Sequence, residues 1–367
     1  MNGTWGSSLG LTIYGESHGN GLGVVINNLP PGIKLDLDAI KKEMDRRKPG
    51  TSKLATPRSE ADAFEILSGF FEDHTTGAPL AIVIRNTNQR SRDYSKVKDV
   101  LRPGHADWTA FKKYRGFQDY RGGGHFSGRL TAGLVFAGAV AQQVLKTENI
   151  EVGALIKSIG PIKSSMISLE DLLNASFEGW KSSSLPVMED TKKDQMIAFI
   201  DQTRESHDSV GGQIYVAAKG LPPGLGQPFF HSMESRIAHI MFSVPAVKGI
   251  EFGKGFEITE MYGHEANDPI YLEGDEICSK TNNNGGILGG ITNGMPLEVT
   301  VAIKPTPSIG QLQETVNIKT GEKINHAVEG RHDPCILPRA VPVIESVLAI
   351  AILDAMMDEG YKFHVDK

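Results

Sequence analysis

Two stretches of the sequence share one pattern, and they predict the fold. Residues 23–32 read GVVINNLPPG, and residues 212–224 read GQIYVAAKGLPPG. In each, a short run rich in β-branched residues ends at Leu-Pro-Pro-Gly, where the prolines stop a strand and the glycine permits a turn. A helical pattern follows both stretches. This repeated pattern predicts an internal duplication, in which two similar units share one core, although four matching residues also arise by chance.

Further elements follow from the same reasoning. Strands are expected where short β-branched runs lie between Gly, Pro or Asn clusters, at residues 22–26, 80–84, 213–217 and 297–303. Helical periodicity appears at residues 38–47, 131–146, 192–204 and 341–357. Because strands and helices do not alternate in a regular βαβ rhythm, we predict an α+β fold of antiparallel sheets with helices packed on them. Residues 164–193 show the least patterning and are expected to form a peripheral insertion.

Length and composition indicate one large globular unit. No low-complexity linker divides the 367 residues, so residues 1–367 are treated as a single domain. Hydrophobic residues make up 40% and charged residues 22% of the chain, which excludes wholesale disorder. The 41 glycines are about 11% of the chain, against a usual ~7%, and predict many tight turns or close backbone approaches.

The cysteines and the apolar runs indicate where in the cell the protein is expected. Cys278 and Cys335 cannot build a disulfide framework and do not have zinc-site spacing. The first residues lack the basic start and apolar centre of a signal peptide. The longest apolar runs, 132–141 and 347–353, are too short to cross a bilayer. We expect a soluble cytoplasmic protein without a membrane partner.

The net charge of −6 hides two cationic segments. Residues 41–58 carry seven basic and two acidic residues, and residues 85–131 carry eleven basic and four acidic ones. A basic region in an acidic protein concentrates anionic ligands, so we expect a site for small anions, although ordinary surface charge also produces such runs. Nucleic-acid binding is disfavoured, because the chain is acidic overall and has no nucleic-acid motif.

Residues 15–19 read GESHG and match G-x-S-x-G, the nucleophile elbow of serine hydrolases. An elbow joins a strand to a helix, whereas glycines and a second β-branched run follow this motif. A hydrolase is therefore disfavoured; it would be labelled at Ser17 by a fluorophosphonate. The turn presents Ser17 and His18, and the imidazole could act as a general acid or simply cap the turn.

Two more loops carry candidate residues. Residues 102–107 read RPGHAD, a turn that presents His105 among arginines, although a lone loop histidine is often only a surface residue. Residues 121–131 read RGGGHFSGRLT and run into an apolar helix, whose first N–H groups could bind an anion. The Gly-Lys-Ser/Thr of a Walker loop is missing, and no G-x-G-x-x-G lies between a strand and a helix. The alternative is a glycine hinge with a capping serine.

The last candidates lie near the C-terminus. Residues 281–290 read TNNNGGILGG, and such glycines let a flat ligand approach the backbone, or form two β-turns. Residues 330–335 read GRHDPC, with Arg331 as a bidentate donor and Asp333 as a possible base, or as an Arg–Asp pair that caps the following helix. The polar inventory suits an anionic, phosphorylated substrate but does not name a reaction.

Together these segments resemble the chorismate synthase family over nearly the whole chain. The matching motifs are GESHG at 15, DRRKPGTS at 45, LSGFFEDHTTGAP at 67, IRNTNQRSRDY at 84, RPGHADW at 102, YRGGGHFSGR at 120, GLPPGLG at 220, AVKGIEFGKGF at 246, NNNGGILGGITNG at 282, KPTPSI at 304 and GRHDPC at 330. So many long motifs in the correct order are far beyond chance.

The resemblance implies an activity. The family converts 5-enolpyruvylshikimate 3-phosphate to chorismate and phosphate, a 1,4-anti elimination in the shikimate pathway. The reaction requires reduced FMN without net redox change. The family fold is a β-α-β sandwich assembled as a homotetramer. An external flavin reductase is the expected source of reduced flavin, with NADPH as a possible reductant.

The resemblance also assigns roles to residues. It places His105 near the substrate phosphate, His18 at the reduced flavin, and Asp333 as a helper in abstracting hydrogen from carbon six through the flavin. The implied substrate-binding residues are Ser17, Arg47, Arg58, Arg102, Ser127, Arg129 and Arg331. The implied FMN contacts are His125, Phe126, Ser127, Pro245, Ala246, Gly289, Lys304, Pro305, Thr306, Pro307, Ser308 and Arg331, while Arg47 and Lys53 match positions for NADPH.

Overall fold

A computed structural model describes residues 3–50, 62–86, 98–328 and 332–364, which form two antiparallel five-stranded sheets. The first sheet has the order β1 (Thr4–Trp5), β2 (Gly10–Gly15), β3 (Gly21–Asn27), β7 (Leu80–Arg85) and β4 (Phe64–Ser68). The second has the order β11 (Val247–Phe252), β16 (Leu297–Ile303), β10 (Gly212–Lys219), β8 (Glu151–Ile159) and β9 (Ile162–Lys163).

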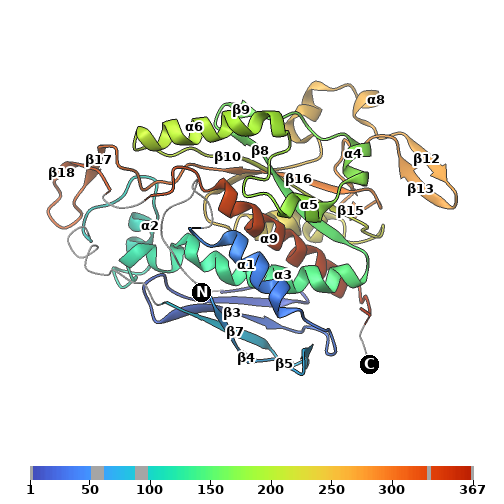
Figure 1. Cartoon of the computed structure of the whole chain (residues 1–367), viewed down its shortest axis with the longest axis horizontal. Coiled ribbons are helices and arrows are strands. Elements are labelled where there is room, and N and C mark those ends of the chain that lie inside the picture. The colour runs from blue at the N-terminus through green and yellow to red at the C-terminus, as the bar shows by residue number, and fades with distance from the viewer. Residues whose placement is uncertain (1–2, 51–61, 87–97, 329–331, 365–367) are drawn as a thin grey trace.

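A layer of helices separates the two sheets (Figure 1). It contains α1 (Leu37–Arg47), α3 (Thr131–Thr147) and α9 (Leu337–Asp358), and α7 (Met233–Met241) packs on α9 and β11. The outer face of the second sheet carries α4 (Leu169–Asn174), α5 (Phe177–Lys181) and α6 (Lys193–Glu205). The predicted α+β sandwich of antiparallel sheets and helices is confirmed.

Helices α3 and α9 form the centre of the core because both are apolar on nearly every side. α3 reads TAGLVFAGAVAQQVLKT, and 13 of its 17 residues are buried. At Gly138 the two helices touch, since a Cβ there would lie 2.1 Å from the Cβ of Ser346 on α9. α9 is long and apolar enough to cross a membrane, but it is almost completely buried inside the protein. We therefore describe it as a core helix.

Buried charge ties the layers together. Glu345 of α9 is fully buried, and it accepts hydrogen bonds from the backbone N–H of Ala154 on β8 (3.0 Å) and from Arg46 on α1 (Nη2 to Oε1, 3.1 Å). Asp354, further along α9, accepts from the N–H groups of Ser8 and Leu9, both at 2.8 Å. Because an unpaired buried carboxylate is costly, these partners fix α9 against both sheets.

The chain order in the two sheets supports the predicted duplication. The first half runs β2, β3, α1, β4, β7, α3, and its strands lie in the spatial order β2-β3-β7-β4. The second half runs β8, β10, α7, β11, β16, α9, with the spatial order β8-β10-β16-β11. The two Leu-Pro-Pro-Gly segments follow β3 and β10, the central strands of their sheets. The topology matches, while common ancestry of the two halves stays a prediction.

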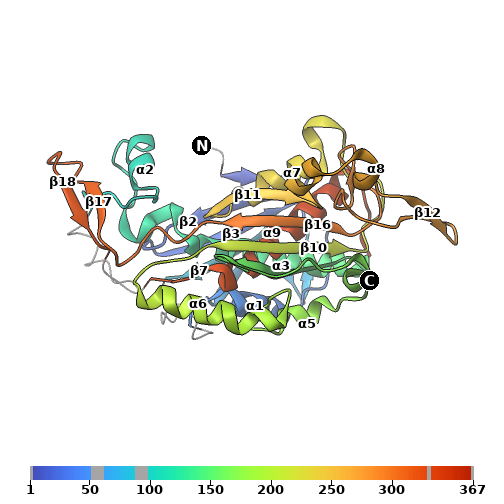
Figure 2. The same cartoon turned by 90° about the horizontal axis from the view of Figure 1, so that it is seen from above.

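The remaining elements are short hairpins and helices. They are β5 (Phe70–Phe71), β6 (His74–Thr75), β12 (Ile270–Glu273), β13 (Glu276–Ser279), β14 (Ile287–Leu288), β15 (Ile291–Thr292), β17 (Gln313–Val316), β18 (Lys323–His326), α2 (Asp107–Lys113), α8 (Gly263–Ala266) and the 3₁₀ turns η2 (Arg121–Phe126), η3 (Gly128–Leu130), η4 (Asp190–Lys192), η5 (Phe229–His231) and η6 (Gly255–Glu260). Figure 2 shows the β12–β13 and β17–β18 hairpins projecting from opposite ends of the molecule.

Candidate active site

The turn that carries Ser17 and His18 joins two strands of one hairpin, β2 and β3. A nucleophile elbow requires a helix after the strand, so this geometry rejects the serine hydrolase alternative. The amide of Asn86 holds the turn, donating to the carbonyls of Glu16 (3.0 Å) and Gly19 (2.9 Å). The turn is therefore fixed to the end of the neighbouring strand β7.

The glycine-rich segment η2 brings the two candidate histidines together. Gly122 and Gly123 have φ angles of 59° and 85°, a left-handed conformation that favours glycine. A Cβ on Gly122 would lie 2.2 Å from Cε1 of His18, and one on Gly123 would lie 3.3 Å from Nε2 of His105. The backbone of the glycine triplet thus separates the two imidazoles, and a side chain at Gly122 would displace His18.

His105 belongs to a compact loop closed by an ion pair. Arg102 binds the carboxylate of Asp107 through Nε (2.8 Å) and Nη2 (2.7 Å), and its backbone N–H donates to the same group at 3.0 Å. Nδ1 of His105 lies 2.7 Å from that carboxylate. Although burial opposes ionisation, Arg102 and His105 hold the pKa of Asp107 far below its ordinary value. The guanidinium predicted to bind substrate is thus engaged by Asp107.

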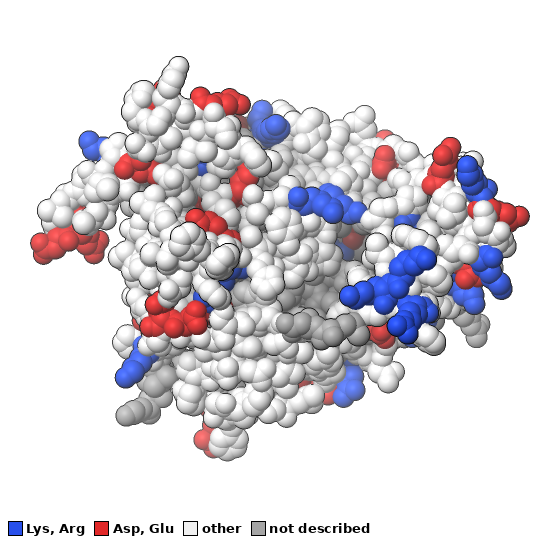
Figure 3. Space-filling model, turned by 180° about the vertical axis from the view of Figure 1, so that it is seen from behind, with Lys and Arg blue, Asp and Glu red and all other residues white. Residues whose placement is uncertain are grey.

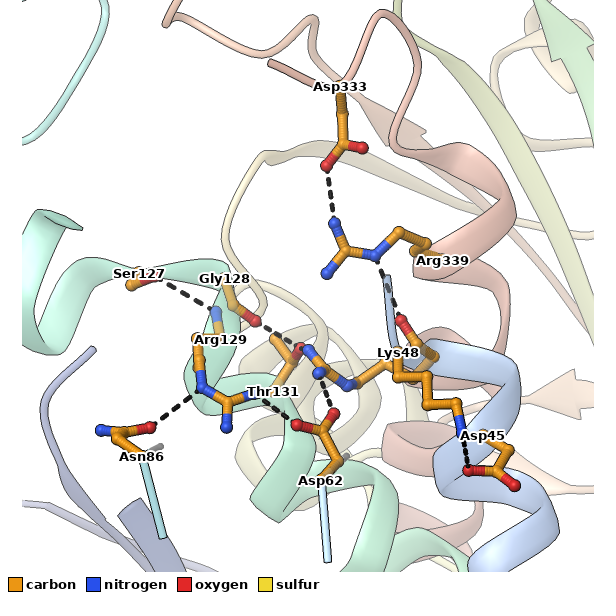
Figure 4. A network of polar contacts seen from close by, with 11 residues as sticks. Asp45, Lys48, Asp62, Asn86, Ser127, Gly128, Arg129, Thr131, Asp333 and Arg339 are labelled. Atoms are coloured by element: carbon orange, nitrogen blue, oxygen red, sulfur yellow. Dashed lines mark hydrogen bonds and ion pairs between the residues drawn. The ribbon is translucent and has the colours of Figure 1, made fainter. Parts of the chain in front are cut away.

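A second ion-pair network lies beside Ser127, Gly128 and Thr131, at the start of α3 (Figure 4). Asp62, buried at 5% exposure, binds the guanidinium groups of both Arg47 and Arg129. Nε of Arg129 also donates to Asn86 (3.1 Å), which holds the Ser17–His18 turn. Although burial raises the pKa of Asp62, the two arginines together lower it below its usual value. Arg47 is almost inaccessible, so its contacts favour positioning over direct ligand binding.

Ser127 precedes the short helix η3 and caps it. Its Oγ accepts a hydrogen bond from the backbone N–H of Arg129 at 3.3 Å. The alternative of a capping serine is therefore what the structure shows, and a ligand contact would use the remaining capacity of the hydroxyl. Of the neighbours in η2, His125 places Nδ1 2.8 Å from the carbonyl of Gly15, and Phe126 is 38% exposed.

The loop after β16 joins the site from the second sheet. Nζ of Lys304 donates to the carbonyl of Gly104 at 2.6 Å, and its N–H donates to Ala246 at 2.9 Å. Burial lowers the pKa of Lys304, and the neighbouring Lys248 lowers it further. The other predicted members of these two loops, placed with them, are Pro245, Pro305, Thr306, Pro307 and Ser308.

Asp333 reaches the same region from the start of α9. The hydroxyl of Thr306 donates to its backbone carbonyl at 3.1 Å, and Arg339 donates to its carboxylate at 2.6 Å. Nε of Arg339 also donates to the carbonyl of Arg47 at 3.1 Å. The cap position of α9 is Ile336, which provides no side-chain hydrogen bond. The alternative of an Arg331–Asp333 cap stays a prediction, because Arg331 lies outside the described residues; among those described, Asp333 pairs with Arg339 in the first turn of α9.

Not every predicted residue can be placed with these loops. Lys53, Arg58 and Arg331 lie outside the described residues. Gly289 lies in the β14–β15 turn, beyond the start of β16, whereas Lys304 follows the end of that strand. Within one chain the structure therefore does not bring Gly289 to the other loops (Figure 1).

Sequence reasoning missed several positioning residues. Asp62, Asn86, Asp107 and Arg339 each fix a predicted residue through hydrogen bonds. Asn86 and Asp107 stand inside quoted motifs without having been singled out, whereas Asp62 and Arg339 lie outside them. Figure 3 shows the molecule from behind, with a hollow in this face. Lys and Arg side chains gather beside the hollow, toward the end of the molecule that carries α2. The surroundings of the site therefore favour an anionic ligand, as the charge distribution predicts.

Comparison with known proteins identifies the family. Residues 9–357 match the family model described as chorismate synthase. The chain is 45% identical over 353 residues to a chorismate synthase of Pyrococcus abyssi, covering 96% of this chain and 97% of that protein. It is 44% identical over 368 residues to one of Methanocaldococcus jannaschii, covering 98% and 97%.

A solved structure agrees with these sequence relatives. The crystal structure of a chorismate synthase superposes with a TM-score of 0.77 at 31% sequence identity, covering 97% of this chain and 93% of the other. This chain belongs to the chorismate synthase family, and it is a lyase of aromatic amino acid biosynthesis that eliminates phosphate from 5-enolpyruvylshikimate 3-phosphate to give chorismate.

Proposed function

We propose that the reaction takes place where the glycine loop, the Ser17–His18 turn, the His105 loop and the loop after β16 converge. The observation that carries this proposal is the approach of His18 and His105 to the backbone of Gly122 and Gly123. Two imidazoles held against one glycine-rich segment place two possible proton donors close to each other. An elimination of phosphate needs such donors, because negative charge grows on the leaving group.

The residues present fit a bound flavin mononucleotide. The imidazoles of His18 and His105 already lie against the backbone of Gly122 and Gly123, so a flat ring would bind against these side chains rather than on the glycines themselves. Lys304 and Lys248 are neighbouring cations, suited to the phosphate of the nucleotide. His125 and Phe126 at the end of η2, Ser127 directly after it and the 304–308 loop would hold the ring and its side chain. When bound, reduced FMN supplies electron density to the substrate ring without net redox change.

Three side chains have separate roles in this proposal. His105 donates a proton from Nε2 toward the departing phosphate. His18, which packs against Gly122, would donate a proton to the bound flavin. Asp333, oriented by Arg339, is the carboxylate placed to receive a proton. Ser17, Ser127 and Arg129 orient the ligands. Arg47 supports the site indirectly, because it binds Asp62, which also holds Arg129.

The remaining proposals concern partners. Reduced FMN would come from an external flavin reductase, with NADPH as a possible direct reductant, in the cytoplasm. We propose a homotetramer, the assembly that the family resemblance implies; Gly289 would then contact flavin as part of another copy of the chain. A sedimentation measurement checks this assembly; a monomer at assay concentration that retains full activity would contradict it.

Replacing His105 by alanine tests the proposed site. The variant should lose activity 100-fold or more, the order of general acid catalysis, while still binding FMN. His264→Ala, at an exposed position on α8, is the matched control and should keep normal turnover. Normal turnover in His105→Ala would refute the proposed role of this residue.

A further inference from the structure

The loop of residues 102–107 contains an acid–imidazole pair next to the proposed site. Nδ1 of His105 lies 2.7 Å from Oδ1 of Asp107 and 3.1 Å from Nη2 of Arg102. Arg102 can only donate, and the carboxylate can only accept. Nδ1 therefore either carries a proton and donates a hydrogen bond to Asp107, or carries a lone pair and accepts a hydrogen bond from Arg102.

The distances decide between these two arrangements. A lone pair on Nδ1 would face a carboxylate oxygen at 2.7 Å, placing two acceptors in contact. A proton on Nδ1 instead gives a short charge-assisted hydrogen bond to Asp107. In this arrangement two donors, Nδ1 of His105 and Nη2 of Arg102, lie 3.1 Å apart. This contact is longer, and Nη2 already donates to Oδ1 of Asp107 at 2.7 Å. The Nδ1–H form is therefore favoured.

With Nδ1 bound to Asp107, Nε2 of His105 is the ring nitrogen that remains for the proposed site. Nε2 faces η2, where a Cβ on Gly123 would lie 3.3 Å from it. Held by Asp107 on one edge and by the glycine backbone on the other, the imidazole has little freedom to rotate. Arg102 and Asp107 carry opposite charges and form an ion pair at 2.7 Å within the loop. In the part of the chain that the structure describes, Lys304 also contacts this loop, donating to the carbonyl of Gly104.

We infer that Asp107 is a positioning residue for the elimination: it accepts Nδ1–H of His105 and thereby directs Nε2 at the phosphate. This inference rests on the role proposed for His105. The single carboxylate serves two tasks, because it closes the loop through Arg102 and fixes the tautomer and orientation of the imidazole. Hydrogen-bonded acceptors behind a histidine have this effect in other acid–base sites.

Asp107→Asn tests the inference in the assembled enzyme. Asn keeps the shape but replaces one acceptor with a donor, so Arg102 and His105 can no longer both be satisfied. We expect turnover to fall on the order of 10- to 100-fold, below the full effect of a general acid, with KM little changed. The falling limb of the pH–rate profile should move to lower pH, because the protonated imidazole loses its anionic partner.

A matched control and a second measurement complete the test. Asp201→Asn, which also removes an aspartate paired with arginine but on the exposed face of α6, should leave turnover unchanged. Nitrogen NMR of the wild-type protein should show His105 protonated at Nδ1; a lone pair at Nδ1 would overturn the inference even if Asp107→Asn failed to fold. Unchanged turnover and pH profile in folded Asp107→Asn would also overturn it. A normal His105→Ala enzyme with Nδ1–H present would instead refute the role of His105 alone.

Discussion

At the scale of single residues, buried carboxylates hold the arginines of the site in place. Asp62 binds Arg47 and Arg129, and Arg129 in turn holds Asn86 beneath the Ser17–His18 turn. Removing one partner of a buried ion network leaves the other charges uncompensated. The stability of the protein and the geometry of its site therefore depend on the same group.

We predict that Asp62→Asn lowers the free energy of unfolding by about 3–5 kcal/mol at neutral pH. The pKa of Asp62 is depressed in the folded state, so its contribution is present above the ordinary aspartate pKa of about 3.9 and is lost as the pH falls through the lower folded value. Urea unfolding as a function of pH measures this, and the difference between variant and wild type should shrink in acid. Glu178→Gln, in the exposed pair with Lys42, should change little. Equal stability of Asp62→Asn and wild type at pH 7 would contradict the account.

Asp333 gives a second prediction at this scale. Because Ile336 rather than Asp333 occupies the cap of α9, Asp333→Asn should fold normally and bind FMN while the elimination slows at least tenfold. Stopped-flow measurement of chorismate formation, with a parallel flavin titration, separates the two effects. Loss of folding in this variant would show that the pair with Arg339 is structural.

At the scale of elements, the glycine triplet of η2 is the part of the site least tolerant of change. Gly122→Ala would place a Cβ 2.2 Å from His18, so we predict a loss of activity on the order of 100-fold from misplacement of the imidazole. Gly360→Ala is the matched control: Gly360 has a similar positive φ of 75°, but nothing lies within 4 Å of its Cβ position. If both variants retained full turnover, the close packing of His18 on η2 would have no catalytic importance.

The elements also show how far sequence patterns reach. Helix α3 was predicted at 131–146 and found at Thr131–Thr147, and β16 was found at its predicted residues 297–303, because continuous apolar patterns mark buried elements well. Helix α9 begins four residues before its predicted start at 341, since its first turn contains Pro338, which a helix start tolerates but which interrupts the helical pattern in the sequence. Residues 164–193 are peripheral as predicted, but α4 and α5 there pack on the second sheet, through short helices that periodicity does not reveal.

The candidate site was only partly predictable for a different reason. His18, His105 and Asp333 stand in turns with distinctive sequences, so they could be named. Their supports could not, because Asp62 meets Arg129 from 67 positions away in sequence. Such pairings depend on how strands from both sheets end at one place, which a single sequence does not encode locally.

At the scale of the whole molecule, the site is assembled from loops of both sheets. The Ser17–His18 turn leaves the first sheet, and the Lys304 loop leaves the second, so substrate and flavin bound between them would each complete the other's surroundings. We predict that FMN binds at least fivefold more tightly with 5-enolpyruvylshikimate 3-phosphate present, within the usual range of coupling between sites. Equilibrium titration with and without substrate measures the difference, and equal affinities would contradict a shared pocket.

The most direct test of the account is an anaerobic assay of the purified protein. Dithionite-reduced FMN and 5-enolpyruvylshikimate 3-phosphate are mixed with the enzyme, and chorismate and released phosphate are followed together. The account predicts that both products appear in equal amounts, only when the flavin is reduced, and that His105→Ala slows both alike. Equal product formation with oxidised flavin, or an undiminished rate in His105→Ala, would contradict the site described above.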